Sequence, residues 1–306
     1  MIVGIPYSLT DDKEWLDFTV SQASKYADEV LVITDRGAPS ISLPAGVQMW
    51  AQGRGVGRAR NVAAQYALSK DQCLLFMDSH MVILSDPTPL CAHTLAQPKI
   101  VLVEGKPNKY QVGSGYTLGS FLDKNTWKWG YIYRGLYTIM TTEPSYAVSP
   151  TILQRLIEIQ GVYTVVPGWG MESFDPTLSA ARLGYVMDIV PEVVIGHVYK
   201  VGSPSSWSAR AVSTDCTGEP FCGKLGGSVY FNLIKWGKCI YALKHYGRTQ
   251  GLPVEQDVCS LVPQLDQDTM NRVDAFNQVA PYTIDDVYNF FERALTTMSW
   301  SWVGQL

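Results

Sequence analysis

Short apolar segments alternate with stretches of helical periodicity through the first hundred residues. Five apolar segments have the length of a strand: 2–6, 29–34, 47–51, 73–77 and 99–103. Between them, one helical stretch runs from a capping Asp11 or Asp12 to about Tyr26, and another from Val56 to Ser69 after a glycine-rich turn. This alternation predicts an α/β domain with a mostly parallel sheet.

The pattern changes after residue 105. Residues 106–146 are rich in Gly, Tyr, Trp and Thr, which predicts loops and antiparallel strands. A helix over 150–160 follows, and a second helix is expected from Asp175 to Gly184, with Asp175 as N-cap before Pro176. A strand is expected over 185–195.

Beyond about residue 205 the composition shifts toward Cys, Trp and Tyr, with helical stretches at 228–246 and 283–298. We therefore expect one α/β domain over 1–205, which changes character at about residue 105, and a helical extension over 206–306. A subunit contact made by this extension is one expectation, so a homo-oligomer stays an open alternative.

Composition narrows the class of protein. Of the 306 residues, 46% are hydrophobic, which permits a large core and excludes wholesale disorder. The net charge of −4 argues against a general nucleic-acid binder, which needs an excess of basic residues. The N-terminus shows no targeting signal and no apolar run is long enough to cross a bilayer, so we expect a soluble, cytoplasmic protein.

The six cysteines form no Cys-x-x-Cys pair, so a structural zinc site is not expected. Cys73 lies in an apolar segment and is expected to be an inert core residue. Cys216 and Cys222 are close enough to bridge in an oxidising compartment, whereas a cytoplasm would keep them as free thiols.

Two short segments at strand ends carry candidate metal ligands. Asp78-Ser79-His80 follows an apolar strand, and ligands of open α/β sheets bind beyond the carboxyl ends of the strands. Alternate residues of an extended segment point the same way, so Asp78 and His80 can converge on Mn²⁺ or Mg²⁺. His197, in Gly196-His197-Val198, would be the third ligand. The alternatives are a turn-capping Asp, a surface His and a hydrogen-bonded structural His.

These segments resemble motifs of the polypeptide N-acetylgalactosaminyltransferases. Asp78-Ser79-His80 resembles their Asp-x-His metal motif, residues 168–173 are similar to their Trp-Gly-Gly-Glu-Asn segment, and residues 194–200 resemble their Val-Gly-His-Val-Phe-Arg segment. Ile5-Pro6-Tyr7, a strand ending at Asp35, and Gly57-Arg58-Ala59-Arg60-Asn61 resemble the wider GT-A transferases. The resemblance covers residues 1–202 and includes no lectin domain. It implies a GT-A fold and a metal-dependent, hexosyltransferase-type enzyme that uses a sugar nucleotide, expected to be a UDP-sugar.

The resemblance further implies that the domain over 1–205 is catalytic, with a nucleotide-sugar half over about 1–105 and an acceptor half over about 106–205. The extension over 206–306 would then cover the acceptor side of the cleft or form a subunit contact.

The resemblance also implies roles for individual residues. Asp78, His80 and His197 would hold the metal, and Lys200 would supply a positive charge near the diphosphate.

Other residues would contact the donor. Pro6, Tyr7 and Asp35 would lie against the nucleoside, and Arg58 would face the nucleotide unless it is a solvated helix residue. Trp169 would shape the sugar or acceptor pocket, with a core Trp as its alternative. Residues 203–207 would form a mobile loop over the donor, with a plain linker as the alternative.

Glu172 and Asp175 bear on the stereochemistry of transfer. In inverting GT-A enzymes the comparable segment usually reads Glu-Asp-x-Asp, and its second residue is the general base. Here the segment is Glu172-Ser173-Phe174-Asp175, and serine cannot be that base unaided. We expect Asp175 to cap its helix and Glu172 to hydrogen-bond the donor sugar or the acceptor. This arrangement points to retention of anomeric configuration.

Other functions fit the sequence less well. The turn over 53–57 lacks the third glycine of a dinucleotide-binding fingerprint, and no Walker phosphate loop is present. An inverting transferase that uses Asp175 as its base, and a non-catalytic sugar-nucleotide-binding protein, remain as alternatives. The acceptor, whether saccharide, protein or small molecule, is not identified by the sequence.

Overall fold

The computed structural model describes residues 1–9, 11–35, 37–51, 55–116, 118–123, 128–133, 137–138, 140–141, 145–165, 172–185 and 187–198. The expected extension over 206–306 lies outside these residues. In chain order, the first elements are β1 (Ile2–Pro6), α1 (Lys13–Ala23), β2 (Glu29–Asp35), β3 (Val47–Ala51), α2 (Val56–Ser69), β4 (Leu74–Phe76), β5 (Met81–Ile83) and the 3₁₀ helix η1 (Thr88–Ala92). They are followed by β6 (Leu95–Lys106), β7 (Lys109–Tyr116), β8 (Leu118–Asp123), β9 (Lys128–Tyr133), β10 (Tyr137–Thr138), β11 (Met140–Thr141), β12 (Tyr146–Val148), α3 (Pro150–Gln160), α4 (Phe174–Arg182) and β13 (Met187–Val198).

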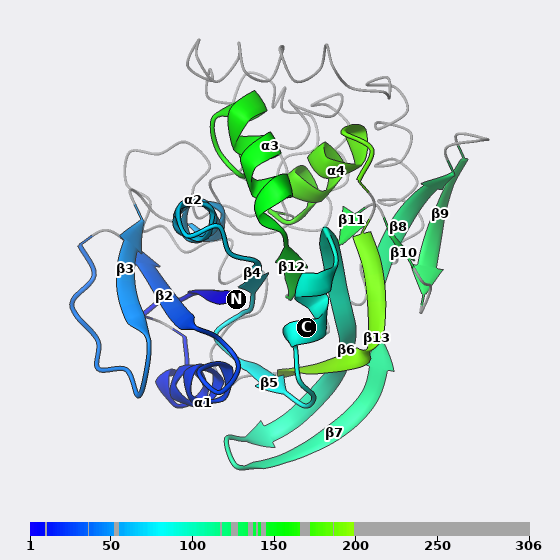
Figure 1. Cartoon of the computed structure of the whole chain (residues 1–306). Coiled ribbons are helices and arrows are strands. Elements are labelled where there is room, and N and C mark those ends of the chain that lie inside the picture. The colour runs from blue at the N-terminus through cyan, green and yellow to red at the C-terminus, as the bar shows by residue number, and fades with distance from the viewer. Residues whose placement is uncertain are drawn as a thin grey trace, which may run out of the picture.

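A mixed sheet forms the centre of the molecule (Figure 1). Its strand order is β10-β13-β6-β12-β4-β1-β2-β3, with β5 added to β13 and β7 added to β6. The strands β1 to β4 run parallel to one another, as do β6 and β13, whereas β12 is antiparallel to both β4 and β6. Consequently β4 and β13 point the same way, and their carboxyl ends lie at one edge of the sheet.

A second, three-stranded antiparallel sheet contains β8, β9 and β11. It confirms the antiparallel strands expected between residues 106 and 146. The bounds predicted for β1, β3, α2 and α3 also agree with the structure.

Alternate residues of the strands pack into two apolar layers, one on each face of the central sheet. Ile2 and Leu31 belong to the layer under α2, α3 and α4, whereas their neighbours Val3 and Val30 belong to the layer under α1. Figure 1 shows α1 on one side of the sheet and α2, α3 and α4 on the other. The period-two pattern of buried strands therefore produces helices on both faces.

Helix α2 packs close to the sheet because most of its inner face is made of small side chains. The alanines of this face are Ala59, Ala63, Ala64 and Ala67, and all are buried. A Cβ atom at Gly4 of β1 would lie 2.8 Å from the Cβ of Ala63, so only glycine fits there without movement. The α2 backbone therefore lies almost against β1.

A disulfide joins Cys73, just before β4, to Cys91 in η1, with the two Cα atoms 5.7 Å apart. The expectation that Cys73 is an inert core residue within a strand is wrong, because β4 begins at Leu74 and the Cys73 thiol is oxidised. Disulfides are rare in the cytosol, so this bond disagrees with the expectation of reduced thiols. Cys216 and Cys222 lie outside the described residues.

Among the described residues, no helix combines the length and the apolar character that crossing a membrane requires.

Candidate active site

Main-chain pairing brings the three candidate metal ligands together at the sheet edge. Asp78 lies two residues beyond the end of β4, and His80 lies in the turn that leads into β5. His197 lies near the end of β13, opposite Met81 of β5 in the antiparallel register. The Val198 N–H donates to the His80 carbonyl oxygen across 3.2 Å. The two histidines, far apart in sequence, are thus held side by side by backbone hydrogen bonds.

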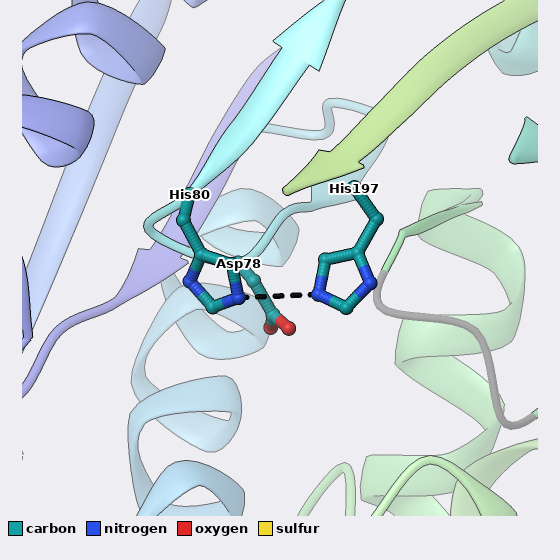
Figure 2. A group of neighbouring side chains, drawn as sticks. All are labelled: Asp78, His80 and His197. Carbon is teal, nitrogen blue, oxygen red and sulfur yellow. Dashed lines mark hydrogen bonds between the residues drawn. The ribbon is translucent and has the colours of Figure 1, made fainter. Parts of the chain in front are cut away.

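The side chains of these residues converge. Figure 2 shows the imidazoles of His80 and His197 pointing toward each other, with the Asp78 carboxylate beside them. The two Nε2 atoms are 3.1 Å apart, and the ligand atoms of all three residues lie within 4.8 Å of one another. All three side chains are partly exposed, so an ion and its remaining ligands can reach them.

This set of donors fits a divalent metal ion. Nitrogens bound at about 2.1 Å to one ion are about 3 Å apart when they are neighbouring ligands at right angles, close to the Nε2 separation seen here. One carboxylate with two imidazoles suits ions such as Mn²⁺. Three protein ligands also leave coordination positions for the oxygens of a bound molecule.

Helix α1 fixes the turn that carries Asp78 and His80. The buried Thr19 of α1 donates its hydroxyl to the Met81 carbonyl oxygen and accepts from the Met81 N–H, at 2.9 and 3.1 Å. The Ser79 hydroxyl donates to the Asp11 carboxylate at 3.3 Å and lies 3.4 Å from His80 Nδ1. A serine that donates to Asp11 accepts from His80 Nδ1–H, which leaves the Nε2 lone pair of His80 for a metal.

Gly196, next to His197, allows β13 to approach its neighbours. A Cβ atom at this position would lie 2.4 Å from Cγ2 of Val103 on β6 and 3.3 Å from Cβ of Val82 on β5. A side chain at 196 would therefore push β13 away from the strands that set the position of His197.

A second cluster, which sequence reasoning missed, surrounds Arg60 of α2. Its guanidinium is 2% exposed and pairs with the Glu172 carboxylate, with Nη2 and Oε1 3.2 Å apart. Its Nη1 donates to the Ser173 hydroxyl at 2.7 Å and to the Tyr146 hydroxyl at 3.4 Å. Helical spacing did carry a signal, because Arg60 shares the inner face of α2 with Ala63 and Ala67, where an arginine needs a buried partner.

The expected capping role of Asp175 is wrong. Helix α4 begins at Phe174, so Asp175 lies within its first turn. The Asp175 carboxylate accepts instead from the Thr164 hydroxyl at 3.1 Å and from the Val165 N–H at 3.0 Å. Asp175 is fully buried, and these tertiary partners replace the helix N–H groups that a cap would bind.

The side chain of Asn61, the residue after Arg60, binds the backbone of Thr164, whose hydroxyl contacts Asp175. Its amide donates to the Thr164 carbonyl oxygen at 2.9 Å and accepts from the Thr164 N–H at 2.8 Å. Consecutive residues of α2 therefore fix residue 164 and residues 172–173.

The residues expected to contact the nucleoside lie at the same sheet edge as the candidate metal ligands. Pro6 ends β1, and Tyr7 follows it, largely buried. Burial, and then the charges of nearby aspartates, raise the pKa of the Tyr7 hydroxyl, so it is neutral at physiological pH. Asp35 ends β2 and accepts from the Gly55 N–H before α2, at 3.3 Å. Arg58 is half-buried in the first turn of α2.

Three sequence predictions fall outside the described residues: Trp169, Lys200 and the loop over 203–207.

Comparison with known proteins shows the fold. No protein-family model matches the chain, and no curated protein matches it. Among solved structures, a crystal structure of GalNAc-T7 with UDP, GalNAc and Mn²⁺ is similar, with a TM-score of 0.60 and 16% identity. The similarity covers 97% of this chain and 57% of that one, so the chain spans just over half the length of this neighbour.

A structure of A197 from STIV matches with a TM-score of 0.37 and 11% identity, covering 64% of this chain and 84% of that one, which is too weak to support an argument. The central sheet is mixed and flanked by helices, and the GalNAc-T7 structure is a structural neighbour. The chain therefore has the GT-A fold predicted from its sequence.

Proposed function

We propose that this protein is a metal-dependent glycosyltransferase that moves a sugar from a UDP-sugar to an acceptor hydroxyl. The observation that carries the proposal is the convergence of Asp78, His80 and His197 at the carboxyl edge of a GT-A sheet. The neighbour GalNAc-T7, which was crystallised with UDP, GalNAc and Mn²⁺, supports the choice of nucleotide and ion.

The protein residues have distinct parts in this proposal. Asp78, His80 and His197 hold the ion, which when bound neutralises the charge that develops on the departing diphosphate. Lys200 adds a positive charge on the same side. Tyr7 and Asp35 face the nucleoside from the ends of β1 and β2.

The remaining donor-binding residues complete the proposal. Pro6 lies against the nucleoside beside Tyr7, and Arg58 faces the nucleotide from the first turn of α2. Trp169 shapes the sugar or acceptor pocket, and residues 203–207 close over the donor.

We further propose that transfer retains the anomeric configuration. An inverting enzyme needs a carboxylate within reach of the acceptor hydroxyl. Ser173 accepts from Arg60, and the Asp175 carboxylate is buried against Thr164 and Val165. Both residues are thus engaged in the fold, which supports a mechanism driven by stabilisation of the leaving group. The departing phosphate oxygen then takes the acceptor proton.

The test of the metal site is a screen for nucleotide release across sugar nucleotides, with and without Mn²⁺. His80→Ala and His197→Ala should each abolish Mn²⁺-dependent release and weaken Mn²⁺ binding in the presence of UDP. His93→Ala is the matched control, because His93 pairs with Asp188 on the surface, 2.7 Å away. Release that is unchanged by a chelator would refute the metal-dependent mechanism.

Stereochemistry is tested separately by NMR of the product's anomeric proton, starting from an α-linked donor. A β-linked product would refute retention and restore the inverting alternative, with Asp175 as its base. UDP and Mn²⁺ binding without any turnover would instead favour a sugar-nucleotide-binding protein.

A further inference from the structure

The Arg60 guanidinium and the Glu172 carboxylate form a buried ion pair. Arg60 is 2% exposed, and its guanidinium lies 5.4 Å from the centroid of the Phe76 ring and 5.5 Å from that of Tyr146. Glu172 is also buried. Removing a cation and a carboxylate from water costs several kcal/mol per ion unless their geometry is favourable. A buried pair of this kind is therefore weak grounds for a purely stabilising role.

The guanidinium binds two consecutive residues, Glu172 and Ser173, which lie immediately before α4. Nη2 pairs with the Glu172 carboxylate, and Nη1 donates to the Ser173 hydroxyl. A lysine has a single charged group and cannot make both contacts in this fixed geometry. Because two bonds diverge from one planar group, they fix the direction of the Glu172 side chain as well as its place.

The pair also lies next to the strand that leads to the metal ligands. The Phe76 ring beneath Arg60 belongs to the last residue of β4, two residues before Asp78. Burial lowers the pKa of Arg60, but electrostatic interactions with Tyr146, Glu172 and Asp78 outweigh this and raise it above its ordinary value. Arg60 is thus charged at every physiological pH and interacts electrostatically with the carboxylates of both Glu172 and Asp78.

We propose that Arg60 is a positioning residue that aims the Glu172 carboxylate at a hydroxyl of the donor sugar, an inference that rests on the proposed transferase function. A carboxylate has about four lone-pair sites, so Glu172 can accept from Arg60 and from a sugar hydroxyl together. The chemical group recognised is a sugar hydroxyl, and the nucleotide and metal are held by other residues. Arg60 acts on sugar binding and turnover through Glu172.

The experiment uses the full chain and compares Arg60→Lys, Arg60→Met, Glu172→Gln and the double variant Arg60→Met/Glu172→Gln. Two quantities are measured: the affinity for UDP with Mn²⁺, and kcat/KM for hydrolysis of the sugar nucleotide that wild type turns over. Affinity for UDP with Mn²⁺ should stay within about twofold of wild type for Arg60→Lys and Glu172→Gln, since both keep the positive charge that interacts with Asp78 and no sugar hydroxyl is involved. Each single variant should lose about 10- to 100-fold in kcat/KM, the range for a hydrogen bond to a charged group.

The double variant is decisive. If Arg60 acts through Glu172, the double variant is no slower than Glu172→Gln alone. Leu156→Ala is the control for general loosening, because Leu156 is a buried apolar residue of α3 in the same apolar layer. Arg60→Lys keeps a buried positive charge for Glu172, so it tests the inference if Arg60→Met does not fold.

Three outcomes would each overturn the inference while leaving the transferase function intact. The first is a double variant whose loss in kcat/KM is the product of the two single losses. The others are wild-type kinetics for Arg60→Lys and Arg60→Met, and an equal loss in kcat/KM for Leu156→Ala. A wild-type protein that neither binds UDP with Mn²⁺ nor hydrolyses any sugar nucleotide would overturn the proposed function itself, and the inference with it.

Discussion

Gly196→Ala should destabilise the fold because β13 has no room for a side chain there. The new Cβ atom would lie 2.4 Å from Cγ2 of Val103, well inside van der Waals contact, and 3.3 Å from Cβ of Val82. Both neighbours belong to strands that hydrogen-bond to β13 on either side, so neither can move far without breaking ladder pairing. Overpacking of this kind costs about 1–3 kcal/mol of unfolding free energy.

The assay is urea denaturation of the full chain, with Gly113→Ala as the control. Gly113 lies on the exposed strand β7, where a Cβ atom would come no closer than 3.4 Å to the Leu102 carbonyl oxygen. Its substitution should change the unfolding free energy by less than about 0.5 kcal/mol. Affinity for Mn²⁺ with UDP should fall for Gly196→Ala alone, since the displaced strand carries His197.

The double variant Gly196→Ala/Val103→Ala tests the stated cause. Removing Cγ2 of Val103 relieves the closest contact, so the double variant should be more stable than the sum of the single effects by about 0.5–3 kcal/mol. Strictly additive losses, or a Gly196→Ala protein as stable as wild type, would refute the packing argument.

Three further predictions concern stability. Replacing Cys73 and Cys91 by alanine should lower the unfolding free energy by about 3 kcal/mol, because the disulfide closes a loop with a sequence separation of 18 residues; thiol titration of the denatured wild type should show this pair oxidised. Asn61→Ala should cost about 1–3 kcal/mol by leaving both Thr164 backbone groups without their partner, measured by thermal unfolding. Burial raises the pKa of the Tyr163 hydroxyl well above 10 in the folded chain. Its contribution to the unfolding free energy is therefore complete below about pH 10 and is lost as the pH rises further, because only the unfolded chain ionises there. Alkaline urea titrations of Tyr163→Phe should therefore fall less steeply with pH than those of wild type.

The convergence of the three candidate metal ligands could be predicted because each lies in a short segment whose local pattern sets its position. Asp78 and His80 come directly after an apolar strand, and His197 lies near the end of another. In a parallel sheet, strand direction alone brings such residues to one edge. No knowledge of side-chain packing was needed to place them together.

The Arg60 cluster could not be predicted in the same way, because its partners depend on tertiary packing. Arg60 and Ser173 are 113 residues apart, and nothing near either residue specifies the other. Of the two arginines in this motif, the sequence analysis predicted a nucleotide contact for Arg58, which is nearer the start of the helix. The unused signal was the helical spacing that places Arg60 on the alanine face of α2.

Asp175 and Cys73 show how long-range partners override local signals. Asp-Pro at a helix start is typical of a cap, yet Asp175 binds Thr164 and Val165, in a segment that approaches only in the folded chain. The pairing of Cys73 with Cys91 likewise depends on η1 returning to the start of β4. Local rules describe which bonds a residue can make, and the fold decides which of them are made.

The close approach of α2 to the sheet links the two clusters of the site. Because Gly4 has no side chain, Ala63 can lie against β1. Arg60, one turn earlier on α2, is thereby close enough for its guanidinium to pack over the Phe76 ring. Phe76 ends the strand that leads to Asp78. The glycine–alanine contact in the core therefore helps to set the position of Arg60, and through it that of Glu172, relative to the candidate metal ligands. A larger residue at 4 or 63 would move α2 outward and carry Glu172 away from these ligands.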